Sequence, residues 1–192
     1  MTASRKFDPA KRKKLNNPIR LQWLPPARIW QLVSAENGTE YIDIGAGTGY
    51  LTTHIAQEAT SPIRVHALDI EPLMITEMEQ TLPTDTTIMT RLMEHNKLPF
   101  ADNSIDGIWL ITLFHEVTPP DLLLKEIQRV LRPDHTMVIV DWQKKQEDCD
   151  QGPPFEHRVS LQTALDQVAA AGFHAVQEQS EFQHHFCITA CS

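Results

Sequence analysis

The sequence predicts an α/β three-layer sandwich, in which a seven-stranded, mostly parallel sheet lies between two layers of helices. Two observations predict it. Short apolar runs typical of strands alternate along the chain with stretches typical of helices, as in repeated strand–helix–strand units. The last two runs follow each other across a short turn, so the last strand is expected to be antiparallel. The 192 residues suffice for one well-cored domain.

The first 39 residues are expected to form an arm and a helix that precede the domain of residues 40–192. Pro25 and Pro26 favour the start of a helix, because proline fits the first helical turn. This helix would carry Ile29, Trp30 and Val33 on one face.

Strand and helix candidates alternate through the domain. Strands are expected at 40–44, 63–69, 86–90 and 105–111, and helices at 49–58, 72–82 and 119–131. The run HTMVIVDW at 135–142 is apolar enough for a strand that is buried on both faces. A last helix at 160–172 ends at Gly172. The chain closes with a hairpin of strands 173–179 and 181–190, the second placing on one face Phe182, His184, Phe186, Ile188 and Ala190.

Charge is distributed unevenly along the chain. The formal net charge is −8, but the first 14 residues hold six Lys or Arg against one Asp, which leaves the remainder near −13. A field of that sign repels nucleic acid, so a polynucleotide substrate is disfavoured. The basic tail is either a local patch that overrides this field or a solvated terminal arm.

The sequence gives no sign of a membrane partner. No apolar run approaches the roughly 20 residues that a membrane span needs. The charged N-terminal segment lacks the apolar core of a secretory signal, so a cytoplasmic location is expected.

The segment YIDIGAGTGYLTTHIA joins a strand-like run to a helix-like run through a turn with three glycines. A dinucleotide fingerprint would need glycine at position 50, where Tyr50 stands, which argues against a nicotinamide oxidoreductase. A P-loop also fails, because no Gly-Lys-Ser/Thr follows. The remaining pattern, Asp43-x-Gly45-x-Gly47-x-Gly49, brings bare backbone against a ligand without demanding a pyrophosphate.

Two acids indicate what that ligand is. The carboxylate of Asp43 beside the turn opposes an anionic ligand and suits a cationic or amine-bearing one. Asp69 ends the next strand, where a carboxylate can accept hydrogen bonds from two ribose hydroxyls. A nucleoside with a positive, amino-acid-like appendage and no phosphate is S-adenosylmethionine. The alternative for Asp69 is a cap on the helix that begins at Pro72.

With these residues, the chain resembles a class I S-adenosylmethionine-dependent methyltransferase, of the branch whose quinone-methylating members are best known. The resemblance covers roughly residues 40–190. Besides the glycine turn, MEHNKLPFADNSIDGIWL is similar to the family's D-A-x-x-L-P-F-x-D-x-x-F-D segment. LFHEV resembles the segment after the fourth strand, and LLLKEIQRVLRPDHTMVIVDW is similar to the helix, K-P-G-G turn and strand that follow.

The resemblance implies a Rossmann-like fold, an N-terminal arm that acts as a lid, and a donor site. Asp43 and the backbone at Gly45 and Gly47 would hold the methionine end, Asp69 the ribose, and Glu94 and His95 the adenine. The remaining donor-site candidates are Ala46, Gly49, Ile70 and Leu110. Two departures stand out: Asp134-His135 replaces the family's Gly-Gly, and His95 replaces a small residue beside the adenine.

Candidates for the acceptor side follow the fourth and fifth strands. His115 and Glu116 would form an acid/base pair, since histidine titrates near neutrality; the alternative is a helix cap or a contact that fixes the loop. In GPPFEHR, Glu156, His157 and Arg158 would reach a bound acceptor. The alternative for Arg158 is an ion pair with Asp141 or Glu156. These groups have no metal-site spacing, so no metal is expected.

The leading hypothesis is therefore methyl transfer to a small molecule by a monomer or homodimer. Whether the attacked atom is O, N, S or C stays open, and a general base is optional because the sulfonium is a good leaving group. The Asn-Pro-Pro-Tyr segment of enzymes that methylate nucleic-acid bases is absent, since LFHE stands there. The alternative is a non-catalytic module that senses S-adenosylmethionine or scaffolds a partner on the same fold.

Overall fold

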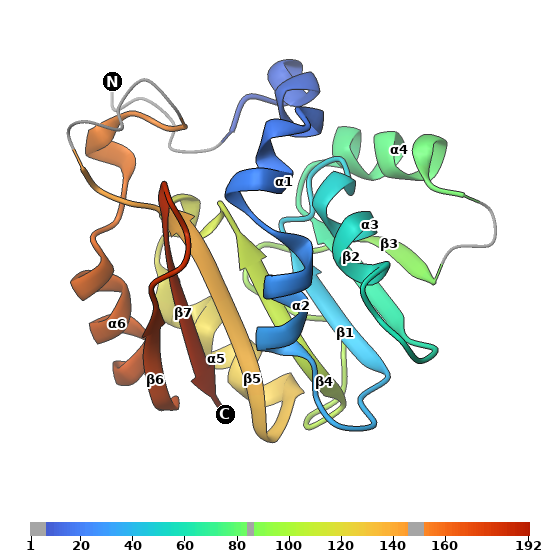
Figure 1. The fold of residues 1–192 in the computed structure, drawn as a ribbon. Coiled ribbons are helices and arrows are strands. Elements are labelled where there is room, and N and C mark those ends of the chain that lie inside the picture. The colour runs from blue at the N-terminus through green and yellow to red at the C-terminus, as the bar shows by residue number, and fades with distance from the viewer. Residues whose placement is uncertain (1–6, 84–86, 146–151) are drawn as a thin grey trace.

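The fold is a single seven-stranded sheet between two layers of helices, shown in Figure 1. The computed structural model describes residues 7–83, 87–145 and 152–192. The strands lie in the order β3-β2-β1-β4-β5-β7-β6. Strand β7 is antiparallel to both of its neighbours, and the pairs among the first five strands are parallel. The predicted three-layer sandwich with an antiparallel last strand is confirmed.

Most predicted elements form close to their expected bounds. The strands are β1 (Glu40–Ile44), β2 (Arg64–Asp69), β3 (Ile88–Leu92), β4 (Ile105–Ile111), β5 (Leu131–Trp142), β6 (His174–Gln179) and β7 (His185–Cys191). The α-helices are α1 (Ile19–Trp23), α2 (Pro26–Val33), α3 (Tyr50–Ala56), α4 (Pro72–Thr81), α5 (Pro120–Val130) and α6 (Leu161–Ala170). Short 3-10 helices are η1 (Pro9–Asn16), η2 (Phe114–Glu116) and η4 (Phe155–His157). The Thr86 end of the expected third strand lies outside the described residues.

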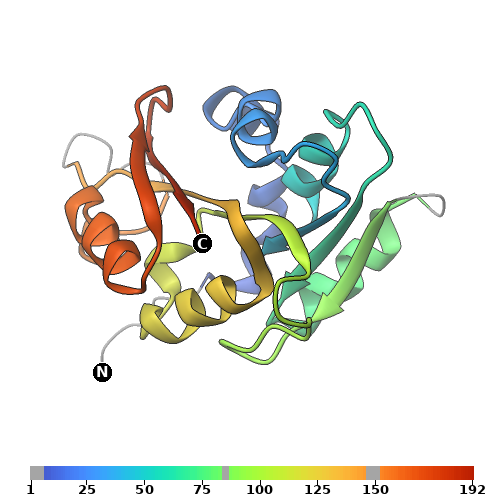
Figure 2. The same ribbon diagram turned by 90° about the horizontal axis from the view of Figure 1, so that it is seen from below.

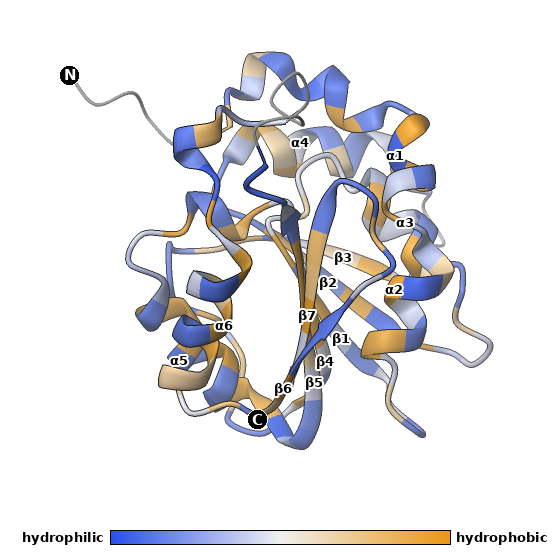
Figure 3. Ribbon diagram, turned by 60° about the vertical axis from the view of Figure 1, so that its left-hand side comes forward, coloured by the Kyte–Doolittle hydropathy of each residue, from blue (hydrophilic) through white to orange (hydrophobic). Residues whose placement is uncertain are grey.

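Each face of the sheet has its own hydrophobic core. On one face, α5 and α6 bury apolar side chains such as Ile127 and Val168 against the strands. On the other face, α2, α3 and α4 bury side chains such as Ile29, Ile55 and Met78. Figure 3 shows the sheet edge-on between these layers, and Figure 2 shows the same layers from below. Central strand β4 is buried along its whole length, as expected for a strand covered on both faces.

The predicted face of the last strand is wrong at its start. Phe186, Ile188 and Ala190 do share one core, but Phe182 belongs to the core on the opposite face. His184 lies outside the strand, with its ring 5.0 Å from that of Trp23. The reason is local: β7 begins only at His185, and a bend before it breaks the two-residue alternation. Strand β5 differs in the other direction, because it begins at Leu131 rather than at 135.

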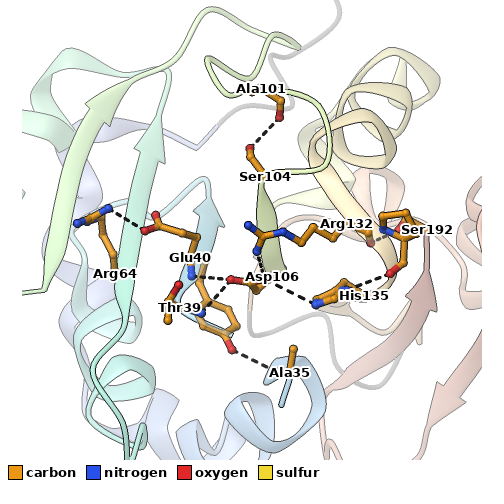
Figure 4. A network of polar contacts seen from close by, with 12 residues as sticks. Ala35, Thr39, Glu40, Arg64, Ala101, Ser104, Asp106, Arg132, His135 and Ser192 are labelled. Atoms are coloured by element: carbon orange, nitrogen blue, oxygen red, sulfur yellow. Dashed lines mark hydrogen bonds and ion pairs between the residues drawn. The ribbon is translucent and has the colours of Figure 1, made fainter. Parts of the chain in front are cut away.

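A polar network closes the sheet edge where the parallel strands begin, as Figure 4 shows. The buried Asp106 carboxylate accepts from the backbone N–H groups of Thr39 at 2.8 Å and Glu40 at 2.9 Å, and it pairs with Arg132. Burial works against ionisation of Asp106, but these hydrogen bonds and the Arg132 charge outweigh it and lower its pKa. The network ties β1, β4 and β5 together at the edge away from the glycine turn.

None of the described helices is long and apolar enough to cross a membrane.

Candidate functional site

The glycine turn after β1 lies against the end of β2. The backbone N–H groups of Gly45 and Ala46 both donate to the carbonyl of Leu68, at 2.8 and 2.9 Å. Gly45 and Gly47 have φ of +73° and +59°, a left-handed backbone that favours glycine. This folding joins the carboxyl ends of two neighbouring strands, the edge at which open α/β sheets bind ligands.

Asp43 lies beneath the turn as a buried carboxylate. Its side chain is 3% exposed, and its Oδ2 accepts from the Thr52 hydroxyl on α3 at 2.6 Å. Burial raises the pKa of Asp43 to about 6, because the ionised form loses its hydration. Nearby Asp69 raises this pKa further, while Thr52 and Arg20 partly offset the effect. A cationic ligand group beside Asp43 would stabilise the ionised carboxylate that burial disfavours.

Asp69 bridges the two strand ends. Its Oδ2 accepts from the backbone N–H of Gly47 and its Oδ1 from that of Glu71, both at 2.9 Å. A carboxylate oxygen accepts more than one hydrogen bond, so acceptor capacity remains for ribose hydroxyls. Burial raises the pKa of Asp69. The cap of α4 is Glu71, whose side chain accepts from Leu73, and not Asp69.

The N-terminal arm covers the glycine turn. Asn16 accepts from the hydroxyl of Thr48 in the turn, and a Cβ at Gly47 would lie 3.0 Å from the Leu15 side chain. Figure 1 shows η1 and α1 at the edge of the sheet where β1 and β4 end. From α1, Arg20 donates to the carbonyl of Leu15 at 2.7 Å and reaches the Thr112 hydroxyl at 3.4 Å. Burial lowers the pKa of Arg20 to about 10.

The other donor-site candidates lie in different surroundings. Ile70 directly follows Asp69 and is 38% exposed. Glu94 and His95 are exposed and line a surface groove beside α5, together with Leu122. Leu110 is fully buried in the core under α5, whereas Leu113 is the side chain that a Cβ at Gly45 would meet, at 2.6 Å. The adenine contacts of Glu94 and His95 and the donor contacts of Ile70 and Leu110 stay predictions.

His115 and Asp141 form a buried pair at the ends of β4 and β5. His115 is 5% exposed and Asp141 is 1% exposed. One oxygen of Asp141 lies 2.8 Å from His115 Nδ1, and the other accepts from the His115 backbone N–H at 2.8 Å. Burial alone lowers the pKa of His115, but the charge and hydrogen bond of Asp141 outweigh it, so the pKa is raised.

Glu116 stands on the other side of the same imidazole. Its Oε1 is 3.7 Å from His115 Nε2, too far for a hydrogen bond, and its Oε2 accepts from the backbone N–H of Phe7 at 3.0 Å. Burial raises the pKa of Glu116. The structure thus brings the predicted pair together and adds Asp141, which the sequence had suggested only as a partner of Arg158.

The segment after β5 is held by Arg158. This side chain is 1% exposed, donates to the carbonyls of Pro153 at 2.9 Å and Gln143 at 3.0 Å, and lies over the Trp142 ring. These contacts fix the loop in place. Glu156 is exposed and His157 half-buried on η4. Their contact with an acceptor, and that of Arg158, stay predictions.

Aromatic side chains from three elements meet near this segment. Trp23 of α1 lies edge-on to Trp142 of β5, with ring centroids 6.2 Å apart. The ring of His185 on β7 is 4.2 Å from Trp142. His185 is 1% exposed, and burial lowers its pKa to about 3. This imidazole is therefore neutral at physiological pH.

Three residues of the site were missed by sequence reasoning: Thr52, Arg20 and the His115 partner Asp141. Thr52 and Arg20 carried no recognisable motif. Asp141 did carry a signal, since an acid at the end of an apolar strand lies at the ligand-binding edge of the sheet.

The fold and the strand-end acids fit a nucleoside ligand that carries a cation. The fit to S-adenosylmethionine is chemical. Among the residues that the structure describes, no cation forms an ion pair with the buried Asp43, Asp69 keeps acceptor capacity, and the turn exposes glycine backbone. Residues 42–139 match the methyltransferase-domain family. The chain belongs to this family and, within it, to the class I S-adenosylmethionine-dependent methyltransferases.

Solved and curated relatives agree with this membership. The chain is similar to the crystal structure of a SAM-dependent methyltransferase from Aquifex aeolicus, with a TM-score of 0.88 and 28% identity over 96% of this chain and 98% of that one. It is 31% identical to an uncharacterized methyltransferase of Mycobacterium bovis over 68% of this chain and 46% of the relative. It is 26% identical to the 2-methyl-6-phytyl-1,4-hydroquinone methyltransferase of Synechocystis over 75% of this chain and 44% of the relative. The chain spans about half the length of these curated relatives.

Proposed function

We propose that the protein transfers the methyl group of S-adenosylmethionine to a small-molecule acceptor, and that His115 takes the proton which the acceptor loses. The observation that carries this proposal is the buried His115–Asp141 pair at the end of β4, the strand that neighbours β1 and its donor turn. A polar pair buried at this edge favours catalysis over a non-catalytic module, which needs no such groups on its acceptor side.

The donor would lie along the ends of β1 and β2. The Asp43 carboxylate suits the ammonium of the donor, the turn of Gly45 and Gly47 suits its methionine part, and Asp69 suits its ribose hydroxyls. When bound, S-adenosylmethionine supplies an electrophilic methyl carbon on a sulfonium whose sulfur is a good leaving group. The task left to the chain is to place the acceptor and to remove its proton.

Asp141 fixes the imidazole for this task. Because its carboxylate lies 2.8 Å from Nδ1, that nitrogen carries the proton and the lone pair stays on Nε2. The raised pKa makes His115 a stronger base than an ordinary histidine once it is neutral. The acceptor atom would attack the methyl carbon in line from about 3 Å, and its proton would pass to Nε2.

The acceptor class follows from similarity and from the surrounding side chains. The Synechocystis relative is named for a hydroquinone, which supports a phenolic or hydroquinone-like acceptor. The aromatic rings of Trp23 and Trp142 on the acceptor side suit a planar molecule. Whether O, N, S or C receives the methyl group is what the assay decides.

The test is methyl transfer by the purified protein. S-adenosylmethionine labelled in its methyl group is incubated with a panel of phenols, hydroquinones, thiols and amines, and the label transferred to the acceptor is measured together with S-adenosylhomocysteine. We expect His115→Gln to lower kcat by about 10²- to 10⁴-fold and to leave donor affinity unchanged. His157→Gln, at the second predicted catalytic histidine, is measured beside it. His174→Gln, at an exposed histidine of β6, is the matched control.

Two results would count against the proposal. Tight donor binding without methyl transfer to any acceptor in the panel would favour the sensor or scaffold. An unchanged kcat in His115→Gln would show that His115 is not a base, so that positioning of the acceptor alone accounts for catalysis.

A further inference from the structure

His185 is a buried imidazole whose two ring nitrogens are unpaired. The residue is 1% exposed, and neither Nδ1 nor Nε2 has a hydrogen-bond partner among the residues that the structure describes. Because burial lowers its pKa to about 3, the ring is neutral, with one N–H to donate and one lone pair to accept. Buried polar atoms are normally paired, since their withdrawal from water without a hydrogen bond is costly. Both ring nitrogens are available to a ligand.

Gln143 adds a third unpaired polar atom at the same place. It directly follows β5, and its Nε2 donates to the backbone carbonyl of His185 at 3.0 Å. Its Oε1 is buried and, within the described ranges, has no hydrogen-bond partner. One donor and two acceptors are thus left unused on two residues that contact each other.

These atoms lie at the ligand-binding edge of the sheet, close to the proposed base. His185 begins β7 and pairs with Trp142, the last residue of β5. The residue before Trp142 is Asp141, whose carboxylate holds His115. The charge of Asp141 also acts on His185. The base and the unpaired atoms therefore meet at the carboxyl end of one strand, where open α/β sheets bind ligands.

Aromatic rings lie next to His185. Its ring centroid is 4.2 Å from that of Trp142, and Trp23 of the arm lies edge-on to Trp142 at 6.2 Å. Such faces favour an aromatic ligand. Two rings that hold a third between them need about 7 Å, twice the van der Waals separation. An aromatic ligand on Trp142 would therefore shift Trp23, and this movement of the arm would give it access to His185.

We propose that His185, together with Gln143, binds a hydroxyl group of an aromatic acceptor whose ring packs on Trp142, and so selects acceptors that carry a hydroxyl besides the attacked atom. This inference rests on the proposed function and narrows its acceptor. A hydroxyl both donates and accepts, so it suits the N–H of His185 and the Oε1 of Gln143 at once. An acceptor without that hydroxyl would leave both atoms unpaired, which is how a polar site rejects an analogue that lacks one hydroxyl.

The test compares two ligands that differ by one hydroxyl. Binding of hydroquinone and of phenol is measured by calorimetry under nitrogen for the parent protein, His185→Phe and His185→Asn. We expect the parent to bind hydroquinone about 10- to 100-fold more tightly than phenol, the range for leaving a buried polar group unpaired. His185→Phe keeps an aromatic ring on Trp142 and should weaken hydroquinone, while phenol, whose single hydroxyl is then held by His115, changes little. His185→Asn keeps a donor and an acceptor and should retain part of the preference.

His66→Phe is the matched control. His66 is another buried histidine, but it lies on β2 and contacts Glu40 through Nε2 at 2.9 Å, so its loss should leave the preference for hydroquinone intact. Affinity for S-adenosylhomocysteine is measured for each variant and should not change. Methyl transfer to the same two ligands gives a second measurement, in which kcat/KM should follow the binding preference.

The outcomes separate this inference from the proposed function. If His185→Phe weakens both ligands equally, the imidazole only packs against Trp142, and the assignment is overturned. Equal binding of hydroquinone and phenol by the parent, or binding of neither, also overturns it. If the parent prefers hydroquinone through His185 but methylates no acceptor, the hydroxyl site stands and the proposed function fails.

Discussion

Replacing Asp43 with asparagine should stabilise the ligand-free protein at neutral pH while abolishing donor binding. Burial raises the pKa of Asp43 from an ordinary 3.8 to about 6, so folding has to hold an ionised carboxylate where the neutral form is preferred. Each pKa unit corresponds to about 1.4 kcal/mol. The difference therefore costs the folded state about 3 kcal/mol above pH 6.

The sign of this pH dependence is definite. Since the pKa is higher in the folded state, the unfolded chain loses its proton first as the pH rises. The contribution of Asp43 to stability therefore falls between pH 3.8 and pH 6 and stays low above. Asparagine does not titrate, and its carbonyl still accepts from Thr52.

The assay is urea unfolding of the parent and Asp43→Asn at pH 4 and pH 7.5 without ligand. The stability of the variant relative to the parent should increase by roughly 2–3 kcal/mol between these two pH values. Comparing two pH values cancels any constant cost of the new amide. Asp166→Asn, which removes the same charge from an exposed site on α6, should show no such change. A difference between variant and parent that does not vary with pH, or a variant that still binds the donor tightly, would refute the reasoning.

Three further predictions concern other charged groups. Asp141→Asn should lower kcat by 10-fold or more. It should also move the rise of kcat with pH toward lower pH, because His115 loses the carboxylate that raises its pKa. An unchanged kcat and an unchanged pH profile would show that Asp141 has no role in catalysis. The parent protein should lose about 2 kcal/mol of stability between pH 7.5 and pH 5, because the buried His185, with a pKa of about 3, binds a proton less readily than the same histidine in the unfolded chain. His185→Phe should lack this loss, and urea unfolding at both pH values checks it. Asp106→Ala should lower the unfolding free energy by about 2–4 kcal/mol, since two backbone N–H groups and Arg132 lose their hydrogen-bond acceptor. Donor affinity should stay unchanged, because this network lies at the opposite edge of the sheet, and a changed affinity would contradict the prediction.

The elements that could be predicted from sequence are those whose pattern is local. Strand β4 has the predicted bounds, because a mostly apolar segment of strand length leaves little choice for where the strand begins and ends. The glycine turn was recognisable as a donor site because its three alternate glycines come together with two strand-end acids and the downstream segments. Asp43 and Asp69 followed from it, since acids at strand ends meet at one edge of a parallel sheet.

The parts that escaped prediction depend on contacts between distant segments. Asp141 pairs with His115 across 26 positions of sequence, and only the neighbouring alignment of β4 and β5 brings them together. Arg20 reaches Thr112 across 92 positions because the arm folds back over the sheet. The predicted face of Phe182 was wrong because a bend precedes β7, and the alternation of apolar and polar residues gives no sign of that bend.

Calorimetric titration of the purified protein with S-adenosylmethionine, S-adenosylhomocysteine and NAD tests the donor site most directly. We predict micromolar binding of the first two ligands, no binding of NAD, and strong loss of affinity in Asp69→Ala. Equal affinity of Asp69→Ala and the parent, or heat from NAD alone, would contradict it.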